Sequence, residues 1–468
     1  MAARKKPIGV FALTMINLAA IMSLRNFTLM APYGLGMVTL FAIAILCFFI
    51  PTALISAELA STTAEEGGAY VWIRNALGAP VAFFCEWISF VTTVASITMT
   101  AVFLTSSMAL TIGPAIAESK IFVFSGVIIT IWTATFLSLR GIELASRIVS
   151  ISTIVGAVVP SAVLIVLAAK WVLSGHALAI SPATQSLCPN LLDFSNISFL
   201  AGLMFAFAGI EMSSYYIRDV KDPKRTFPRA VLISAALILL LFVLGSLSIA
   251  IAVPRDQIRI EAGAMQAIAT LLGSANKSHL VPAFGFLIIF GAVAYIFAWI
   301  SGPVRGLYAV RHAGFLPLVL QKTDSTGLPV ALMLLQAAFV TVFAAFFLFA
   351  PSTSLCFWII NVSSSVLMLF FYGCLFLSGA ILRRRNTRPN AYIYFSIPGG
   401  FYAVCTLAAI GLLNVIFCVA VSFFLPVELF GQMSQRTFAL TVAATSLAMA
   451  CPPAFFMALR KPHWKRTP

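Results

Sequence analysis

One acidic residue, Glu211, interrupts an apolar stretch that begins near Phe199 and leads into a basic loop ending at Arg229. Leu, Ile and Phe each favour membrane insertion by about 0.3 to 0.6 kcal/mol, whereas a central acidic residue costs about 2.5 to 3.5 kcal/mol. Because the gain and the cost nearly cancel, this segment needs neighbouring helices and an interior or aqueous face. A carboxyl group there can take up and release a proton or bind an ammonium group. The alternative is a structural ion pair, for which Arg25 is the candidate partner.

Arg25 is the costliest residue of the first apolar stretch, which covers residues 8 to 30. Its long stem could reach the outer interface, where the guanidinium stays in water. It could instead face an aqueous cavity and pair with Glu211. Both interpretations are open from the sequence.

The composition of the chain indicates that lipid, and not water, surrounds most of the protein. Hydrophobic residues make up 61% of the 468 residues and charged residues only 9%, too few charges to cover a soluble protein of this size. Apolar runs near the 20 residues that a membrane helix needs recur along the chain. We predict an all-α integral membrane protein with about twelve spans, at residues 8–30, 37–60, 81–112, 121–139, 146–170, 197–217, 229–253, 281–308, 329–350, 355–381, 401–425 and 437–459.

The net charge of +15 is a topology signal. If the N-terminus is cytoplasmic, the predicted loops place 22 Lys and Arg residues on the inner side and 6 on the outer side, with Arg25 set aside. This split follows the positive-inside rule. It predicts a multi-pass protein of the cell inner membrane with both termini in the cytoplasm, and it disfavours nucleic acid as a partner.

The metal-ligating and nucleophilic residue types form no cluster in the sequence. The eight cysteines show no CxxC spacing and fall mostly inside spans, where cysteine packs as a small apolar residue. The four histidines are scattered at apparent span ends. We therefore expect no metal site, no cofactor and no enzymatic activity.

Four stretches, in order along the chain, resemble one transporter superfamily. The first is Pro51 to Gly78, which contains AEL and EEGGAYVWI, and the second is FAFAGIEMSS from Phe205 followed by VKDPKRTFPRA from Val220. The third is SGPVRGLYAVRHAGFLP from Ser301, and the fourth is QKTDSTGLPV from Gln321. Together they resemble the amino acid–polyamine–organocation superfamily, and within it the glutamate:γ-aminobutyrate antiporter family, from the first span to about residue 400.

This resemblance implies a leucine-transporter-like fold. Its ten-helix core would cover residues 1–395, with two inverted repeats at about 8–170 and 197–381. Residues 396–468 would add two helices and a short basic cytoplasmic tail. In such folds the first and sixth spans are broken near the midplane, where freed amides bind a carboxylate and freed carbonyls bind a cation or ammonium group.

The sequence departs from the superfamily pattern at two places. The first span lacks the Gly-Ser-Gly type of break and has Ile16 to Ile21 in that region. The fifth span has no lysine in its middle, so it lacks the basic residue that some proton-coupled relatives carry there. The position of the first break and the coupling ion are therefore open.

The candidate site residues lie on four spans. Glu211 and Arg25 are candidates for coupling or gating. The substrate-binding candidates come from the first, sixth, eighth and tenth spans and are Asn17, Ala20, Met22, Phe205, Ala206, Phe207, Ala208, Gly209, Ile210, Tyr295, Trp299, Trp358 and Asn361. For the aromatic members, anchoring at the membrane interface is the alternative role.

We predict an inner-membrane amino-acid transporter that works by alternating access and exchanges two amino-acid-derived solutes. The expected partners are an amino acid or amine, the lipid bilayer and, as one alternative, protons. A proton- or sodium-coupled symporter of the same fold is the other alternative. A non-transporting amino-acid sensor is disfavoured because no soluble output domain is evident. The sequence leaves the identity of the substrate and the oligomeric state open.

Overall fold

The computed structural model describes residues 8–62, 65, 67–112, 119–180, 187, 200–220, 222–258, 263–324, 327–349, 353–385, 395–425, 431 and 433–465. This part of the chain is helical, and its one β contact is an isolated bridge between Ile8 and Val220. Within a bilayer a helix satisfies all of its own backbone hydrogen bonds, which explains why so apolar a chain folds this way. The predicted all-α membrane fold is confirmed.

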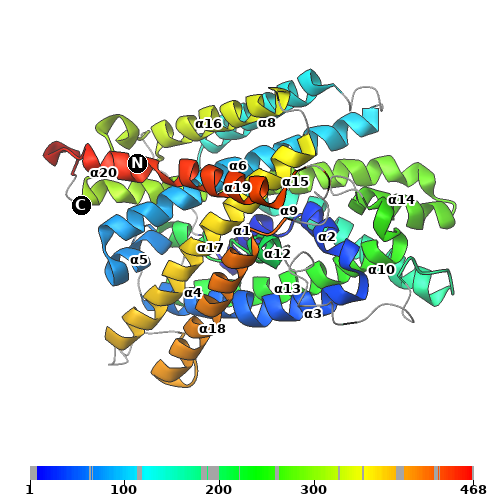
Figure 1. Cartoon of the computed structure of the whole chain (residues 1–468), viewed down its shortest axis with the longest axis horizontal. Coiled ribbons are helices and arrows are strands. Elements are labelled where there is room, and N and C mark those ends of the chain that lie inside the picture. The colour runs from blue at the N-terminus through cyan, green and yellow to red at the C-terminus, as the bar shows by residue number, and fades with distance from the viewer. Residues whose placement is uncertain are drawn as a thin grey trace.

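The helices are named in chain order, and η marks 3₁₀ or π turns (Figure 1). Those up to residue 173 are α1 (Val10–Ile21), α2 (Leu24–Met30), η1 (Ala31–Gly36), α3 (Met37–Ala44), η2 (Ile45–Phe49), α4 (Ile50–Thr62), α5 (Ala69–Leu77), α6 (Ala79–Ile112), α8 (Lys120–Ser138), α9 (Ile142–Thr153), η3 (Ile154–Val158) and α10 (Val159–Leu173). Those after residue 199 are α12 (Leu200–Ala206), η4 (Met212–Asp219), α13 (Pro223–Ala252), η5 (Arg255–Gln257), α14 (Gly263–Ser274), η6 (Ser278–Leu280), α15 (Val281–Ala309), η7 (Val310–Ala313), η8 (Leu318–Gln321), α16 (Val330–Phe349), α17 (Thr353–Arg385), α18 (Gly400–Val421), α19 (Gln435–Ala450), α20 (Pro452–Ala458) and η10 (Pro462–Trp464).

Every predicted span coincides with helix in the structure. Among the described residues, 9 helical segments are long and apolar enough to cross a membrane. The three remaining predicted spans are the first, the sixth and the ninth. The first and sixth are each split into two short helices, and the ninth contains the shorter apolar helix Val330–Ala345.

Contacts between loops sort them into two groups at opposite ends of the molecule. Segments that the charge pattern assigns to the inner side contact one another, through the Ile8–Val220 bridge, Gln321 Nε2 to Trp464 O (2.8 Å) and Arg385 Nη1 to Asn75 O (2.7 Å). Segments assigned to the outer side do the same, through Ala179 N to Ile251 O (2.9 Å) and Thr39 Oγ1 to Leu187 O (2.6 Å). Figure 1 shows α5 and α20 at one end and α14 at the other.

Helix α15 lies in the middle of the bundle. It packs against α6 on one side and against α9 and η3 on another. Where η3 crosses α15, Gly156 and Gly291 meet main chain to main chain, and an added Cβ on either would overlap the backbone of the other. Small residues allow such close helix crossings in membranes. This crossing sets the position of α15 relative to η3. Helix α15 in turn positions Tyr295 and Trp299 near the centre of the protein.

An ion pair ties α4 to the end of α17. Glu58 is 6% exposed, and its Oε1 lies 3.2 Å from Arg383 Nη1. Its other oxygen, Oε2, accepts a hydrogen bond of 2.7 Å from the backbone amide of Ile397. Arg383, the first of three arginines that end α17, therefore has an internal partner.

We expect Glu58→Gln to destabilise the folded protein by about 2 kcal/mol, because it leaves Arg383 without its counter-charge. A fully buried pair would cost more when broken, but the Arg383 side chain is 20% exposed. The thermal unfolding of the purified protein measures this loss. Glu65→Gln is the matched control, because the Glu65–Arg74 pair is exposed (58% and 31%) and should change the melting temperature little. Equal melting temperatures for Glu58→Gln and the wild type would contradict the expectation.

Candidate functional site

The first and sixth spans are both broken, and the two breaks lie next to each other. Helix α1 ends at Ile21, and the backbone becomes extended at Met22 (ψ 98°) and Ser23 (φ −125°, ψ 128°) before α2 begins. Helix α12 ends at Ala206, and a turn leads to η4 at Met212. The predicted breaks are present, and the first one falls at Met22–Ser23 although no glycine stands there.

Two long side chains from other helices hold the backbone at these breaks. The indole of Trp299 on α15 donates a 2.9 Å hydrogen bond to the carbonyl oxygen of Ala20. The hydroxyl of Tyr372 on α17 accepts a 2.8 Å hydrogen bond from the amide of Gly209. Gly209 has φ +118°, and a Cβ there would lie 3.0 Å from Trp299. Glycine is needed at this position both for the backbone conformation and for the close approach of the indole.

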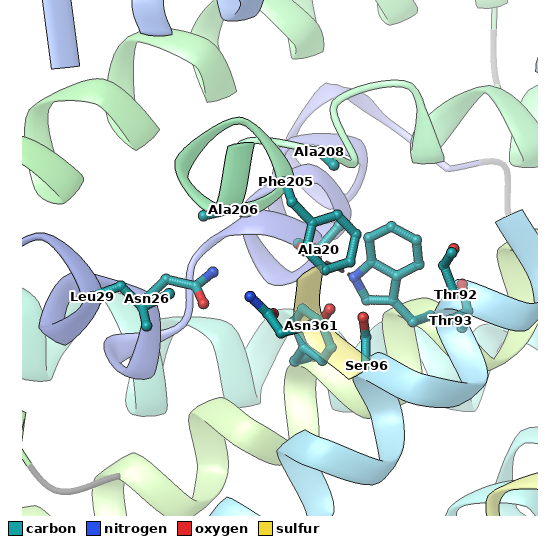
Figure 2. A pocket seen from close by; sticks show the side chains of 13 residues that line it. Ala20, Asn26, Leu29, Thr92, Thr93, Ser96, Phe205, Ala206, Ala208 and Asn361 are labelled. Carbon is teal, nitrogen blue, oxygen red and sulfur yellow. Dashed lines mark hydrogen bonds between the residues drawn. The ribbon is translucent and has the colours of Figure 1, made fainter. Parts of the chain in front are cut away.

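A small cavity lies between the two breaks and helices α6, α15 and α17. Its volume is about 20 Å³, which is room for about one water molecule. The residues that line it are Ala20, Asn26, Leu29, Thr92, Thr93, Ser96, Gly202, Phe205, Ala206, Ala208, Tyr295, Trp299 and Asn361. Figure 2 shows the side-chain amides of Asn26 and Asn361 pointing toward the same space, with the Phe205 ring beside it.

The lining of this cavity combines apolar side chains with polar ones that carry no charge. Thr92 and Thr93 each donate a hydrogen bond back to the α6 backbone, at 2.8 Å to Ile88 O and 2.7 Å to Ser89 O, so their oxygens remain available as acceptors. Asn26 donates weakly to Ile21 O at 3.4 Å. A zwitterion bound here would therefore be held by neutral dipoles and by the peptide groups of the two breaks.

Glu211 lies beside the cavity and not in its lining. Its side chain is 1% exposed, and its Oε2 accepts a 2.8 Å hydrogen bond from the Tyr372 hydroxyl. Because the same hydroxyl accepts from Gly209, one tyrosine joins the broken backbone to the carboxyl group. A change in the charge of Glu211 would act directly on the break. The side chain of Arg25, the predicted ion-pair partner, lies outside the described residues.

The structure brings together part of the predicted substrate-binding set. Seven of those residues line the cavity, namely Ala20, Phe205, Ala206, Ala208, Tyr295, Trp299 and Asn361. The other six lie outside the lining. Asn17 donates to Ser234 Oγ at 3.1 Å, and the Phe207 ring packs against Phe41, Phe49 and Phe242. Gly209 shapes the break, whereas Met22, Ile210 and Trp358 are buried elsewhere.

Sequence reasoning missed the contribution of α6 and α2. Thr92, Thr93 and Ser96 lie on a span that is ordinary in composition, and three hydroxyl residues within five positions were the available signal. Asn26 was also missed; it stands beside Arg25, the costliest residue of the first span. A second buried acid, Glu86, was also missed, although a carboxyl inside a span is as costly there as Glu211.

Comparison with known proteins decides the family. The profile of the amino acid permease family matches residues 8–448. The chain belongs to the amino acid permease family. The resemblance seen in the sequence is confirmed, and this permease is a multi-pass membrane protein.

Curated relatives extend over most of the permease. An uncharacterized transporter of Legionella pneumophila is 32% identical over 425 residues, which is 91% of each chain. A glutamate/gamma-aminobutyrate antiporter of Lactococcus lactis is 27% identical over 437 residues, covering 91% of this chain and 85% of its own. A probable agmatine/putrescine antiporter of Lactococcus lactis is 23% identical over 368 residues, covering 76% and 75%.

Proposed function

We propose that this permease is an antiporter of the cell inner membrane, and that it exchanges an amino acid for another amino acid or an amine by alternating access. The proposal takes its direction from relatives whose names are those of antiporters. The two inverted repeats, at about 8–170 and 197–381, and the cytoplasmic position of both termini are parts of the same proposal. The two groups of loop contacts support this topology.

The observation that carries the proposal is the uncharged cavity between the two broken spans. Peptide groups freed by the breaks can bind the carboxylate and ammonium groups of an amino acid without any charged side chain. The described lining offers amides and hydroxyls and no ionised group, which favours substrates whose net charge is small. Amino acids differing in side chain but sharing the backbone groups would then compete for one site.

The size of the cavity indicates that this structure represents a closed state of the transport cycle, with no room for a substrate. A cavity of about 20 Å³ is far smaller than the 300 Å³ or so of typical ligand pockets. The helices around the breaks must therefore separate to admit a substrate.

Counterflow from proteoliposomes tests the proposed exchange. Vesicles containing the purified permease are loaded with one labelled amino acid, and a panel of unlabelled amino acids and amines is offered outside at acidic and at neutral pH. We expect label to leave only when a suitable solute is present outside. Release driven by an ion gradient alone would favour the symporter, and specific binding with no release under either condition would favour a sensor.

We expect Asn361→Leu to raise the apparent KM of exchange about tenfold while the protein remains folded. The reason is that a site built from neutral hydrogen-bonding groups loses a partner for the substrate, and an unpaired polar group on the substrate is costly. Ser365→Ala, one turn further along α17, is the matched control because Ser365 Oγ bonds to the Asn361 backbone oxygen at 2.7 Å. An unchanged KM in Asn361→Leu would remove Asn361 from the site.

A further inference from the structure

Helix α6 carries a second buried acid, Glu86, which is outside the cavity lining and contacts η4. Glu86 is 0% exposed. It lies seven residues before Thr93, which lines the cavity, and therefore roughly 10 Å along the helix toward α5. The Tyr215 hydroxyl on η4 lies 3.2 Å from both carboxyl oxygens and donates to them.

The Tyr215 ring fits into a slot that glycines leave open. A Cβ on Gly306 would overlap the Glu86 carboxyl and lie 2.6 Å from the Tyr215 ring. A Cβ on Gly68 would lie 2.9 Å from that ring, and one on Gly302 would lie 3.4 Å from it. The ring of Tyr215 is thus packed between the start of α5, α6 and α15, and Glu86 lies at the end of the slot.

No basic side chain in the described part of the chain forms an ion pair with Glu86. The titratable groups that interact with Glu86 are Tyr215 on η4, Tyr70 on α5, the Cys85 thiol beside it on α6, and Glu211 at the break. Arg74 on α5 and Arg311 on η7 lie near Tyr70. The cations have other contacts. Arg74 pairs with Glu65 at 2.8 Å, Arg311 donates to Tyr308 O at 3.1 Å, and Arg305 lies over the Tyr216 ring.

Three buried hydroxyls near Tyr215 have no hydrogen-bond partner among the described residues. They belong to Tyr70, Ser213 and Ser214, which are each at most 1% exposed. Tyr70 lies on α5, outside the membrane-spanning helices, and burial raises the pKa of its hydroxyl to about 12, so it keeps its proton at physiological pH. These groups can bind water when η4 moves, and water beside Glu86 would give its proton a way out.

We propose that Glu86 is a second proton-exchanging carboxyl of this permease, which keeps its proton while Tyr215 fills the slot and releases it when η4 moves away. This proposal rests on the proposed exchange function. An ionised carboxylate without a counter-charge is costly in a dry site, whereas a neutral carboxyl bonded to a hydroxyl is not. Opening toward the α5 end admits water and removes that cost. Acid would therefore favour the closed arrangement, and rising pH would favour opening.

Infrared difference spectra of the full chain in lipid, recorded between acidic and mildly alkaline pH, read the protonation of Glu86 without any transport. We expect the wild type to lose bands of protonated buried carboxyls at the higher pH, one of which is absent from Glu86→Gln and still present in Glu211→Gln. Glu58→Gln is the matched control, because Glu58 has its counter-charge and its replacement should leave the band in place. A spectrum of Glu86→Gln identical to that of the wild type would overturn the proposal.

Exchange assays then test whether this proton matters for transport. We expect Glu86→Gln, which resembles the protonated form, to exchange about fivefold more slowly than the wild type at mildly alkaline pH and equally fast at acidic pH. That factor corresponds to one hydrogen-bonded contact. Tyr215→Phe should also slow exchange at mildly alkaline pH only. Tyr402 is exposed, and Tyr402→Phe should leave the pH dependence unchanged. If Glu86→Gln lowered the exchange rate by the same factor at every pH, Glu86 would have only a structural role, and the proposal would be contradicted.

The two measurements separate this proposal from the proposed function. If the wild type exchanges no amino acid, the exchange function fails, while the infrared band still reports on Glu86. If exchange is present but the wild type lacks the Glu86 band, the proposal for Glu86 is wrong while the proposed exchange function stands. Where Glu86→Gln does not fold, Tyr215→Phe is examined by the same spectra, and an unshifted carboxyl band would overturn the link between Tyr215 and Glu86.

Discussion

Glu211→Gln is expected to reduce the ratio of exchange rates at acidic and neutral pH by about tenfold, the change that one proton produces per pH unit. Glutamine has nearly the size of glutamate and can still accept the hydrogen bond that the Tyr372 hydroxyl donates to Glu211 at 2.8 Å. It has no proton to exchange. The break at Gly209 should therefore keep its shape while its link to pH is lost. Initial rates of counterflow over a range of pH measure the effect.

Tyr372→Phe is the companion variant for this prediction. It removes the hydroxyl that accepts from Gly209 N and donates to Glu211, so it should lower exchange at every pH. A buried amide without a partner costs about 1 to 3 kcal/mol, and the break would become less well defined. If Glu211→Gln retained the full pH dependence of the wild type, Glu211 would be a structural carboxyl and the coupling role would be wrong.

The double variant Glu86→Gln with Glu211→Gln distinguishes one proton site from two. Each of the two carboxyls accepts a hydrogen bond from a tyrosine hydroxyl, Tyr372 for Glu211 and Tyr215 for Glu86. If both exchange protons, each single variant retains part of the pH dependence and the double variant retains none. This arrangement would let η4 respond to two protons, one on Glu211, which directly precedes η4, and one on Glu86, the partner of Tyr215.

The sequence predicted the spans well because lipid imposes a simple rule on length and hydropathy. All twelve predicted stretches contain helix, and the spans of Arg25 and Glu211 are both broken, whereas α6 continues unbroken past the buried Glu86. The same rule says nothing about where a helix breaks. The turn at Met22–Ser23 has no glycine to mark it, and it is held by a tryptophan from residue 299, a contact between positions far apart in the chain.

The site was predicted in part for a related reason. Residues of the broken spans were found from local sequence, and seven candidates do line the cavity. Thr92, Thr93 and Ser96 were missed because which face of α6 points inward depends on how α6 packs against α15. The role of Glu86 depends on Tyr215, 129 residues away. Such pairings come from tertiary packing, which a single sequence does not reveal.

Gly156→Ala is expected to destabilise this permease strongly. At the crossing of η3 and α15, the added Cβ would overlap the main chain of Phe290 and Gly291. Backbone atoms cannot rotate away as a side chain can, so the helices must separate. Overpacking of a tight core costs about 1 to 3 kcal/mol, and this contact lies at the upper end because both partners are backbone.

Loss of transport should accompany this loss of stability. Tyr295 and Trp299 follow Gly291 at intervals of four and eight residues, so they lie on a similar face of α15 and line the cavity. A displaced α15 would move the Trp299 indole away from Ala20 O, its 2.9 Å partner at the first break. We therefore expect Gly156→Ala to lower the melting temperature of the purified protein and to abolish most of the counterflow in proteoliposomes.

Gly373→Ala is the matched control for this prediction. Gly373 also lies within a membrane helix, α17, but a Cβ there would meet its nearest neighbour, Leu412, at an ordinary 3.6 Å. Alanine favours helix over glycine by about 1 kcal/mol, so this variant should be at least as stable as the wild type. If Gly156→Ala behaved like Gly373→Ala, the crossing would have to be looser than the structure shows, and η3 would not set the height of α15. If both variants lost transport, sensitivity to methyl groups would be general in the bundle, and the close approach of Gly156 to Gly291 would have no special role.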